Sequence, residues 1–148
     1  MTLKANASRR AILRPRMRLY LVRHAEAAAG SPDELRPLTP GGREQARALG
    51  ADLRDAGVAP DAIVTSPLLR ARETGLLVGH ELGVDATVDD RLSPGATADA
   101  LSDAVAGRGE TVIAVGHQPD CSRIAAALTG EAPPDFPPAG ALAISLEL

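Results

Sequence analysis

Two histidines and two arginines occur in short polar clusters that are far apart in the sequence. Arg23 and His24 are adjacent, Arg70 follows Ser66 by four residues, and His117 lies much further along the chain. Arginine presents a planar fork of donors that matches the oxygens of phosphate. Histidine attacks as a nucleophile only when it is neutral, and neighbouring arginines disfavour its cationic form. If these residues meet in one pocket, they predict an anion site with a histidine nucleophile.

Each polar cluster follows a short apolar stretch that is typical of a buried strand. The pattern predicts strands over 18–22, 62–65, 84–88, 111–115 and 141–148, and helices over 39–57, 68–82, 97–106 and 121–128. Alternating strands and helices predict a three-layer α/β/α sandwich with a mostly parallel central sheet. The alternating C-terminal stretch is expected to form one antiparallel edge strand. Ligands of such sheets bind at the carboxyl ends of the strands, so the clusters are expected to converge there.

The composition narrows the class of protein. A chain of 148 residues with 45% hydrophobic residues is long enough for one domain with its own core. Cys121 is the single cysteine, which excludes an intramolecular disulfide and multi-cysteine zinc sites. We find no apolar run long enough to cross a membrane. One Tyr, one Phe, no Trp and a net charge of −3 argue against nucleic-acid binding, and we expect a cytoplasmic protein.

Three motifs carry a more specific resemblance. They are Leu21-Val-Arg-His-Ala-Glu26, Thr65-Ser-Pro-Leu-Leu-Arg-Ala-Arg-Glu-Thr74 and Val115-Gly-His-Gln-Pro119. In this order, each after a predicted strand, they resemble the histidine phosphatase superfamily, which includes the phosphoglycerate mutases. The compact length, the Arg36-Pro-Leu-Thr-Pro-Gly-Gly42 segment and the late Pro-Pro-x-Phe loop are similar to its SixA-type phosphohistidine phosphatase branch. The resemblance implies a phosphoglycerate mutase-like fold.

The resemblance also implies a role for each polar residue. His24 would attack phosphorus and become phosphohistidine, which water then hydrolyses. Arg23, Arg70 and His117 would hold the phosphoryl oxygens, so that positioning and electrostatics supply most of the catalysis. Arg36 matches a loop arginine of the SixA branch that reaches the phosphate. No metal and no cofactor are implied.

Ser66 and three carboxylates are assigned less directly. Ser66 is interpreted as a cap of the following helix, with substrate binding as the alternative. Larger family members carry an acidic general acid after the third strand, where this chain offers Asp89 or Asp90, and Glu26 is a further candidate. The SixA branch lacks an obvious acid, which suits a phosphohistidine substrate because its imidazole can leave already protonated. Ala25 replaces the usual glycine, which requires a backbone without positive φ there.

The domain organisation follows from charge and motifs. Six basic residues, from Lys4 to Arg18, precede the first motif, and Glu26 is the first acidic residue. We interpret residues 1–16 as a disordered basic extension and residues 17–148 as the histidine phosphatase domain.

The predicted function is a phosphatase that forms a phosphohistidine intermediate and dephosphorylates phosphohistidine on a protein. Its partner would be a phosphorylated protein or a small phosphorylated metabolite, and the chain is expected to be a monomer. One alternative is a small-molecule phosphomonoesterase of the same superfamily, and another is a catalytically silent phosphate-binding module. A metal site built on His24, His117 and carboxylates is disfavoured because no metal-binding spacing supports it.

Overall fold

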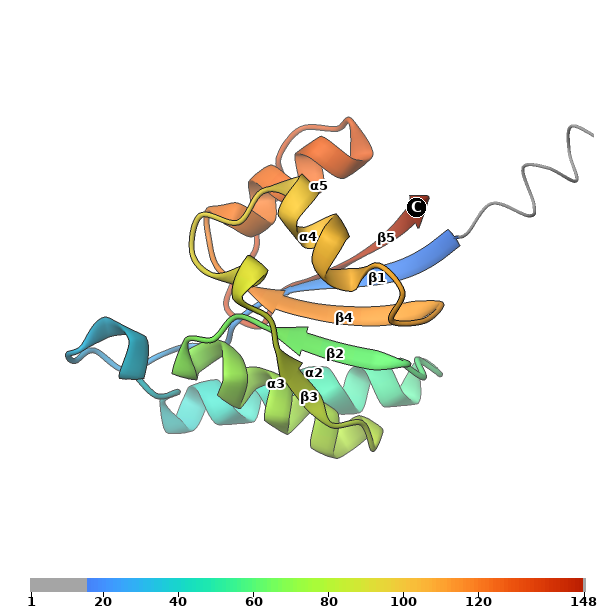
Figure 1. Cartoon of the computed structure of the whole chain (residues 1–148). Helices are drawn as coiled ribbons and strands as arrows, with labels where there is room; N and C mark the ends of the chain where they lie inside the picture. The colour runs from blue at the N-terminus through green and yellow to red at the C-terminus, as the bar shows by residue number, and fades with distance from the viewer. Residues whose placement is uncertain (1–15, 148) are drawn as a thin grey trace, which may run out of the picture.

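The computed structural model describes residues 16–147 (Figure 1). Its strands are β1 (Arg16–Arg23), β2 (Ala62–Thr65), β3 (Ala86–Val88), β4 (Thr111–Gly116) and β5 (Ala141–Glu147). Its α-helices are α2 (Pro40–Asp55), α3 (Leu69–Leu82), α4 (Ala98–Val105) and α5 (Asp120–Thr129), and two short 3₁₀ helices are η1 (Asp33–Leu35) and η2 (Asp90–Leu92). Each expected strand and helix is present, with ends that differ by a few residues.

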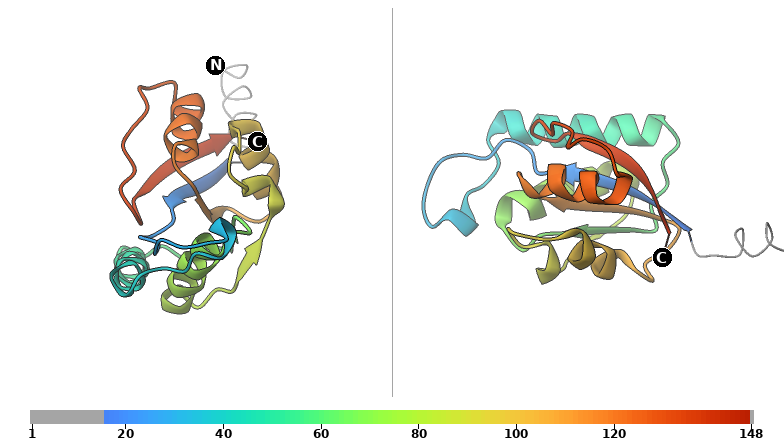
Figure 2. Two further views of the ribbon diagram at one scale, coloured as in Figure 1. Left: turned by 90° about the vertical axis from the view of Figure 1, so that its left-hand side faces the viewer. Right: turned by 90° about the horizontal axis from the view of Figure 1, so that it is seen from above.

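The five strands form one sheet in the order β3-β2-β4-β1-β5. All neighbours are parallel except β5, which runs antiparallel to β1 at the edge. Helices α2 and α3 cover one face and α4 and α5 cover the other (Figures 1 and 2). The predicted three-layer fold with a mostly parallel sheet is therefore confirmed.

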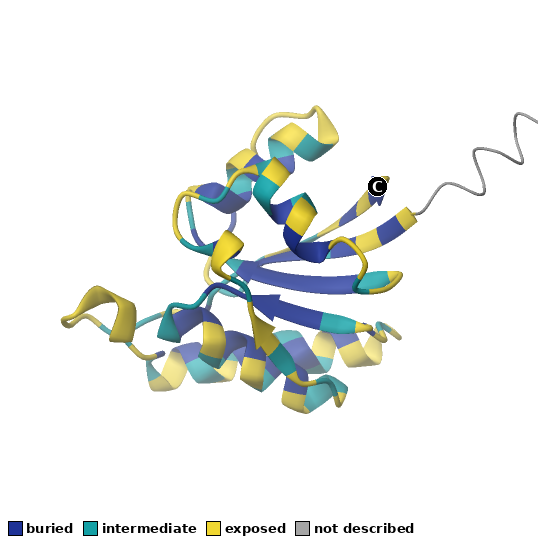
Figure 3. Ribbon diagram, in the orientation of Figure 1, coloured by how far each residue is buried: buried dark blue, intermediate teal, exposed yellow. Residues whose placement is uncertain are grey.

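Both faces of the sheet bury apolar side chains, and the central strands are the most buried part of the chain (Figure 3). Leu21, Leu101 and Ile124 belong to the core under α4 and α5. Ile113 and Val78 belong to the core under α2 and α3. Burial on two faces explains why β4 is a continuous apolar run rather than an alternating one.

Strand β3 is shorter than the expected 84–88 because the end of α3 uses the preceding residues. Gly83 caps the helix in the left-handed conformation, with φ of 72°. The Val84 N–H then bonds to the Gly79 carbonyl at 3.0 Å, so Val84 belongs to the helix end and not to the sheet.

Arg16 belongs to strand β1 and not to the expected basic extension over residues 1–16. Strand β1 begins at this residue, whose guanidinium bonds to Glu147 of β5 at 3.1 Å. The rest of the expected extension lies outside the described residues. Between residues 16 and 147, no helix has the length and apolar character needed to cross a membrane.

Candidate active site

The parallel register brings three strand ends to one edge of the sheet. Arg23 of β1 lies beside Gly116 of β4, and Thr65 of β2 lies beside Val115. Main-chain bonds continue this register past the strands, since the His24 N–H bonds to the Gly116 carbonyl at 3.0 Å. The polar residues that follow β1, β2 and β4 therefore meet, as expected from the sequence.

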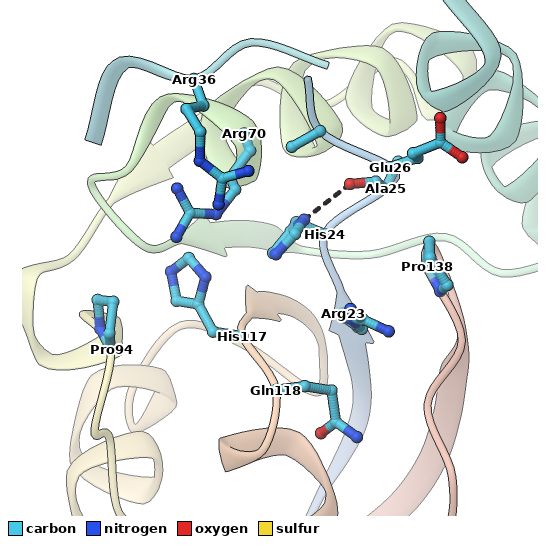
Figure 4. A pocket seen from close by; sticks show the side chains of 11 residues that line it. Arg23, His24, Ala25, Glu26, Arg36, Arg70, Pro94, His117, Gln118 and Pro138 are labelled. Atoms are coloured by element: carbon cyan, nitrogen blue, oxygen red, sulfur yellow. Dashed lines mark hydrogen bonds between the residues drawn. The ribbon is translucent and has the colours of Figure 1, made fainter. Parts of the chain in front are cut away.

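A cavity of about 380 Å³ opens at this edge (Figure 4). Six residues with predicted roles in catalysis or phosphate binding line it, namely Arg23, His24, Glu26, Arg36, Arg70 and His117. The remaining lining residues are Ala25, Ala27, Pro94, Gln118 and Pro138.

His24 is held with one ring nitrogen available to react. Its Nδ1 lies 2.7 Å from the Ala25 carbonyl oxygen. A carbonyl can only accept a hydrogen bond, so Nδ1 carries the hydrogen and Nε2 carries the lone pair. Burial, together with the charges of Arg70, Arg23 and Arg36, lowers the pKa of His24 to about 4, and the hydrogen bond to the Ala25 carbonyl acts in the opposite direction. The ring is neutral at pH 7 and has the form that a nucleophile needs.

His117 is oriented by Ser66. Its Nε2 lies 2.7 Å from the Ser66 hydroxyl, which also accepts the Leu68 N–H at 3.2 Å. The hydroxyl hydrogen is satisfied if it is donated to Nε2, which assigns the ring hydrogen of His117 to Nδ1. Burial is the main cause that lowers the pKa of His117 to about 4, and the charges of His24 and Arg70 act in the same direction. His117 is therefore a neutral donor beside His24, with 5.3 Å between the ring centroids.

The interpretation of Ser66 as the cap of α3 is wrong. The N-cap residue is Leu68, and no side chain caps the helix. Ser66 is fully buried, and it is not among the residues that line the cavity. Its hydroxyl acts on the site through His117.

Three buried polar side-chain atoms within residues 16–147 have no hydrogen-bond partner. They are Nε of Arg23, Nε of Arg70 and Nδ1 of His117. A buried donor without a partner costs about 1–3 kcal/mol, so such atoms are rare and call for an explanation. All three belong to residues that line the same cavity. An oxyanion with several acceptor oxygens, such as a phosphoryl group, would satisfy them together.

The two arginines of the predicted catalytic set are positioned by the main chain. Arg23 donates to the Phe136 carbonyl at 2.9 Å, and Arg70, which is 7% exposed, donates to the Asp33 carbonyl at 2.9 Å. The buried hydroxyl of Thr74 donates to the Arg70 carbonyl at 2.8 Å and accepts the Ala25 N–H at 3.0 Å. Thr74 therefore connects the arginine helix to the segment that carries His24, a role that the sequence did not reveal.

Asp33 is a second contributor that sequence reasoning missed. Its carboxylate accepts from Arg36 Nε at 2.9 Å and from an Arg70 terminal nitrogen at 3.2 Å. The hydrogen bond from Arg36, with that from Arg70, lowers the pKa of Asp33 below its usual value, so the group is ionised at neutral pH. The three-residue spacing of Asp33 and Arg36 was the signal for this pair, because such residues are neighbours on one helical turn.

The candidate general acids are placed differently from one another. Asp89 bonds to Arg91 at 2.8 Å and Arg108 at 3.0 Å, and these arginines hold its pKa well below the usual range. Neither Asp89 nor its exposed neighbour Asp90 lines the cavity. Glu26 does line it, but its carboxylate accepts from the Thr39 hydroxyl at 3.0 Å and points away from His24 in Figure 4.

Ala25 does not have the positive φ that would require a glycine at this position. Among residues 16–147, Ala139 is the only residue other than glycine with a positive φ, so Ala25 adopts an ordinary backbone conformation. Its methyl group is fully buried with Leu38 and Ala46. The substitution therefore costs no backbone strain.

Neither a metal-binding cluster nor a reactive cysteine is found among residues 16–147. No group of three or more His, Cys, Asp or Glu side chains among residues 16–147 is placed to hold a metal ion. The Cys121 thiol is buried, and burial raises its pKa to about 12, so it is a protonated core residue.

This fold and cavity define an α/β protein with a neutral histidine set among oxyanion donors, and comparison with known proteins gives the family. Residues 19–94 match the family model of the histidine phosphatase superfamily (branch 1), to which the chain belongs. It is 37% identical to an uncharacterized protein of Picosynechococcus sp., over 76% of this chain and 73% of that protein. The predicted family and its phosphatase class of hydrolase are thereby confirmed.

The SixA branch also matches, in sequence and in structure. The chain is 28% identical to the phosphohistidine phosphatase SixA of Escherichia coli, over 88% of this chain and 86% of that protein. A solved structure of the protein histidine phosphatase SixA complexed with tungstate superimposes with a TM-score of 0.81. The two chains are 29% identical, and the match covers 88% of this chain and 89% of the other.

Proposed function

We propose that this phosphatase removes the phosphoryl group from phosphohistidine on a protein, through a covalent intermediate on His24. The observation that carries the proposal is the neutral His24 beside three buried donors without partners, on Arg23, Arg70 and His117. The SixA relatives support it, since their names state phosphohistidine phosphatase activity and one binds tungstate, a tetrahedral oxyanion.

In the first step, the Nε2 lone pair of His24 attacks phosphorus and the bond from phosphorus to the substrate nitrogen breaks. The bonding electron pair goes to the substrate ring, which leaves as neutral imidazole if its other nitrogen was already protonated. His24 started in the same state, with hydrogen on Nδ1, so the transfer exchanges two equivalent rings and needs no added proton. Arg23, Arg70 and His117 would stabilise the charge that spreads over the phosphoryl oxygens.

In the second step, water attacks phosphorus and the bond to Nε2 of His24 breaks. The electron pair returns to Nε2, the water loses a proton to a phosphate oxygen or to solvent, and neutral His24 is regenerated. The Ala25 carbonyl keeps the Nδ1 hydrogen in place in both steps, which leaves Nε2 as the reacting atom.

The placement of the carboxylates supports phosphohistidine over phosphomonoesters. An alkoxide leaving group needs a proton from a general acid, which contributes typically 10²–10⁴-fold to the rate. Asp89 and Asp90 lie outside the cavity lining, and the Glu26 carboxylate is turned away from His24. The small-molecule alternative would require Glu26 to leave Thr39 and turn inward.

The test is a comparison of kcat/KM for a phosphohistidine protein, phosphohistidine itself and a panel of sugar and aryl phosphates, with EDTA present. We expect the phosphohistidine substrates to be preferred and His24→Ala to be inactive on all of them. Glu26→Gln should leave turnover of phosphohistidine unchanged. Preferred turnover of a sugar phosphate that Glu26→Gln removes would establish the phosphomonoesterase instead.

A further inference from the structure

Asp33 is a carboxylate that bonds directly to two arginines of the proposed phosphate site, Arg36 and Arg70. Both terminal nitrogens of Arg70 bond to it, one to its main-chain oxygen and one to its carboxylate, while Nε of Arg70 stays buried without a partner. The same carboxylate holds Arg36. The Asp33 side chain is 63% exposed and is not among the residues that line the cavity, so its charge acts on the site through Arg36 and Arg70.

The Asp33 carboxylate affects how strongly the cavity attracts anions. Arg23, Arg36 and Arg70 contribute three positive charges, and the two histidines are neutral at pH 7. The ionised Asp33 offsets part of this positive charge through its bonds to Arg36 and Arg70. The attraction of the site therefore weakens for every anion, and it weakens most for the anion with the largest negative charge.

We propose that Asp33 is a specificity-determining residue that favours a phosphoryl group carried on a cationic imidazole ring over dianionic phosphates. A phosphoryl dianion on a protonated ring has one negative charge overall, whereas a phosphomonoester carries about −1.5 to −2 at pH 7 and inorganic phosphate about −1.5. Asp33 repels the second class more strongly. The inference rests on the proposed function for its preferred substrate, but its effect on phosphate binding is independent of that function.

A purely structural role for Asp33 predicts the opposite result. If the carboxylate served only to hold Arg36 and Arg70 in position, its loss would let them move and would weaken phosphate binding. If it acts as a competing anion, its loss frees one terminal nitrogen of Arg70 and Nε of Arg36 and strengthens phosphate binding. The sign of the change separates the two roles.

The test is Asp33→Asn in the full chain, which removes the charge and keeps the size of the side chain. Glu34→Gln is the matched control, because Glu34 is an exposed carboxylate on the same 3₁₀ helix and makes no contact with the site arginines. Inorganic phosphate binding is measured by titration calorimetry, and kcat/KM is measured for a phosphohistidine peptide and for an aryl phosphate.

We expect Asp33→Asn to tighten phosphate binding about three- to tenfold and to lower the preference for phosphohistidine over aryl phosphate by a similar factor. Both effects should shrink at high salt, which screens exposed charges, and Glu34→Gln should show neither. Weaker or unchanged phosphate binding in Asp33→Asn would overturn the proposal. If the wild type turned over no phosphohistidine, the proposed function would fail, while tighter phosphate binding would still support Asp33 as a competing anion.

Discussion

The floor of the cavity and its rim are fixed by different interactions. The floor, by which we mean the segments after β1, β2 and β4 that carry His24, Arg70 and His117, follows strands whose ends are joined by main-chain bonds. The rim at residues 28–37 is exposed from residue 29 to residue 35, and its Arg36 is held by the Asp33 carboxylate and the Ala28 carbonyl. Buried groups keep a fixed geometry and exposed loops tolerate change, so we expect the floor to set the rate and the rim to set the preference among substrates.

The sharpest contrast is between Arg70 at the floor and Arg36 at the rim. Arg70→Ala should lower kcat/KM at least about a hundredfold, because a lost transition-state donor costs roughly 3 kcal/mol in a buried site. Arg36→Ala should cost about tenfold, since that guanidinium is more exposed. Steady-state kinetics on both variants would check this. Equal losses would remove the distinction between floor and rim.

Arg70→Lys tests whether a positive charge alone is sufficient at this position. A lysine keeps the charge but cannot replace the buried Nε donor together with the two bonds to Asp33. We expect the variant to stay at least about thirtyfold below the wild type in kcat/KM. Near-normal kinetics would show that a point charge suffices at this position.

Ser66→Ala tests whether the floor depends on the orientation of His117. The variant loses the hydroxyl that holds Nε2, and the Nδ1 hydrogen is no longer assigned by that bond. We expect kcat to fall about fivefold, as for a lost hydrogen bond of roughly 1 kcal/mol, with little change in KM. Thr74→Ser is the matched control, because it keeps a buried hydroxyl at the link from Arg70 to Ala25. A change in KM alone would argue against a role through His117.

The titration of the two floor histidines gives a further test. Both pKa values are lowered from 6.5 to about 4 by burial, so both rings should stay neutral as the pH falls to 5 and gain protons only near pH 4. Protonation of His24 removes the Nε2 lone pair, so activity should be lost on the acid side of that titration. NMR of the ring C–H groups, with His24→Asn and His117→Asn for assignment, measures this directly. A midpoint near 6.5 for either ring would contradict the buried, neutral pair.

The smallest effect on catalysis is expected outside the cavity, at Asp89. Its side chain is 9% exposed and bonds to Arg91 and Arg108, so Asp89→Asn should lower the free energy of unfolding by about 1–2 kcal/mol. Activity should change less than about twofold, since Asp89 does not line the cavity. Asp90→Asn is the exposed control and should affect neither quantity. Denaturant melts and kinetics together check the pair, and a large loss of activity in Asp89→Asn would restore it as a candidate acid.

The same contrast explains what the sequence could reveal. The strands were predictable because apolar runs of four to eight residues bounded by polar residues have few other structures available. Parallel strands place their carboxyl ends together, so the convergence of Arg23, His24 and His117 required no knowledge of side-chain contacts. The resemblance to the family then implied a role for each of these residues.

The rim was less predictable because its geometry depends on contacts between segments. The path of residues 28–37 is set by bonds such as that from the Leu38 N–H to the Glu73 carboxylate at 2.8 Å. No local pattern shows that this path brings Asp33 to Arg70, which lies 37 residues away. The role of Ser66 was missed for a similar reason, since a serine before a proline is equally consistent with a helix cap.

The central claim is that Nε2 of His24 carries the phosphoryl group during turnover. Rapid denaturing quench of the wild type with a phosphohistidine substrate, followed by mass spectrometry under alkaline conditions, tests it most directly. We predict a phosphoryl group on His24 that is labile in acid and stable in alkali, and its absence from His24→Ala. Full turnover by His24→Ala, or a phosphoryl group found on a different residue, would contradict the account.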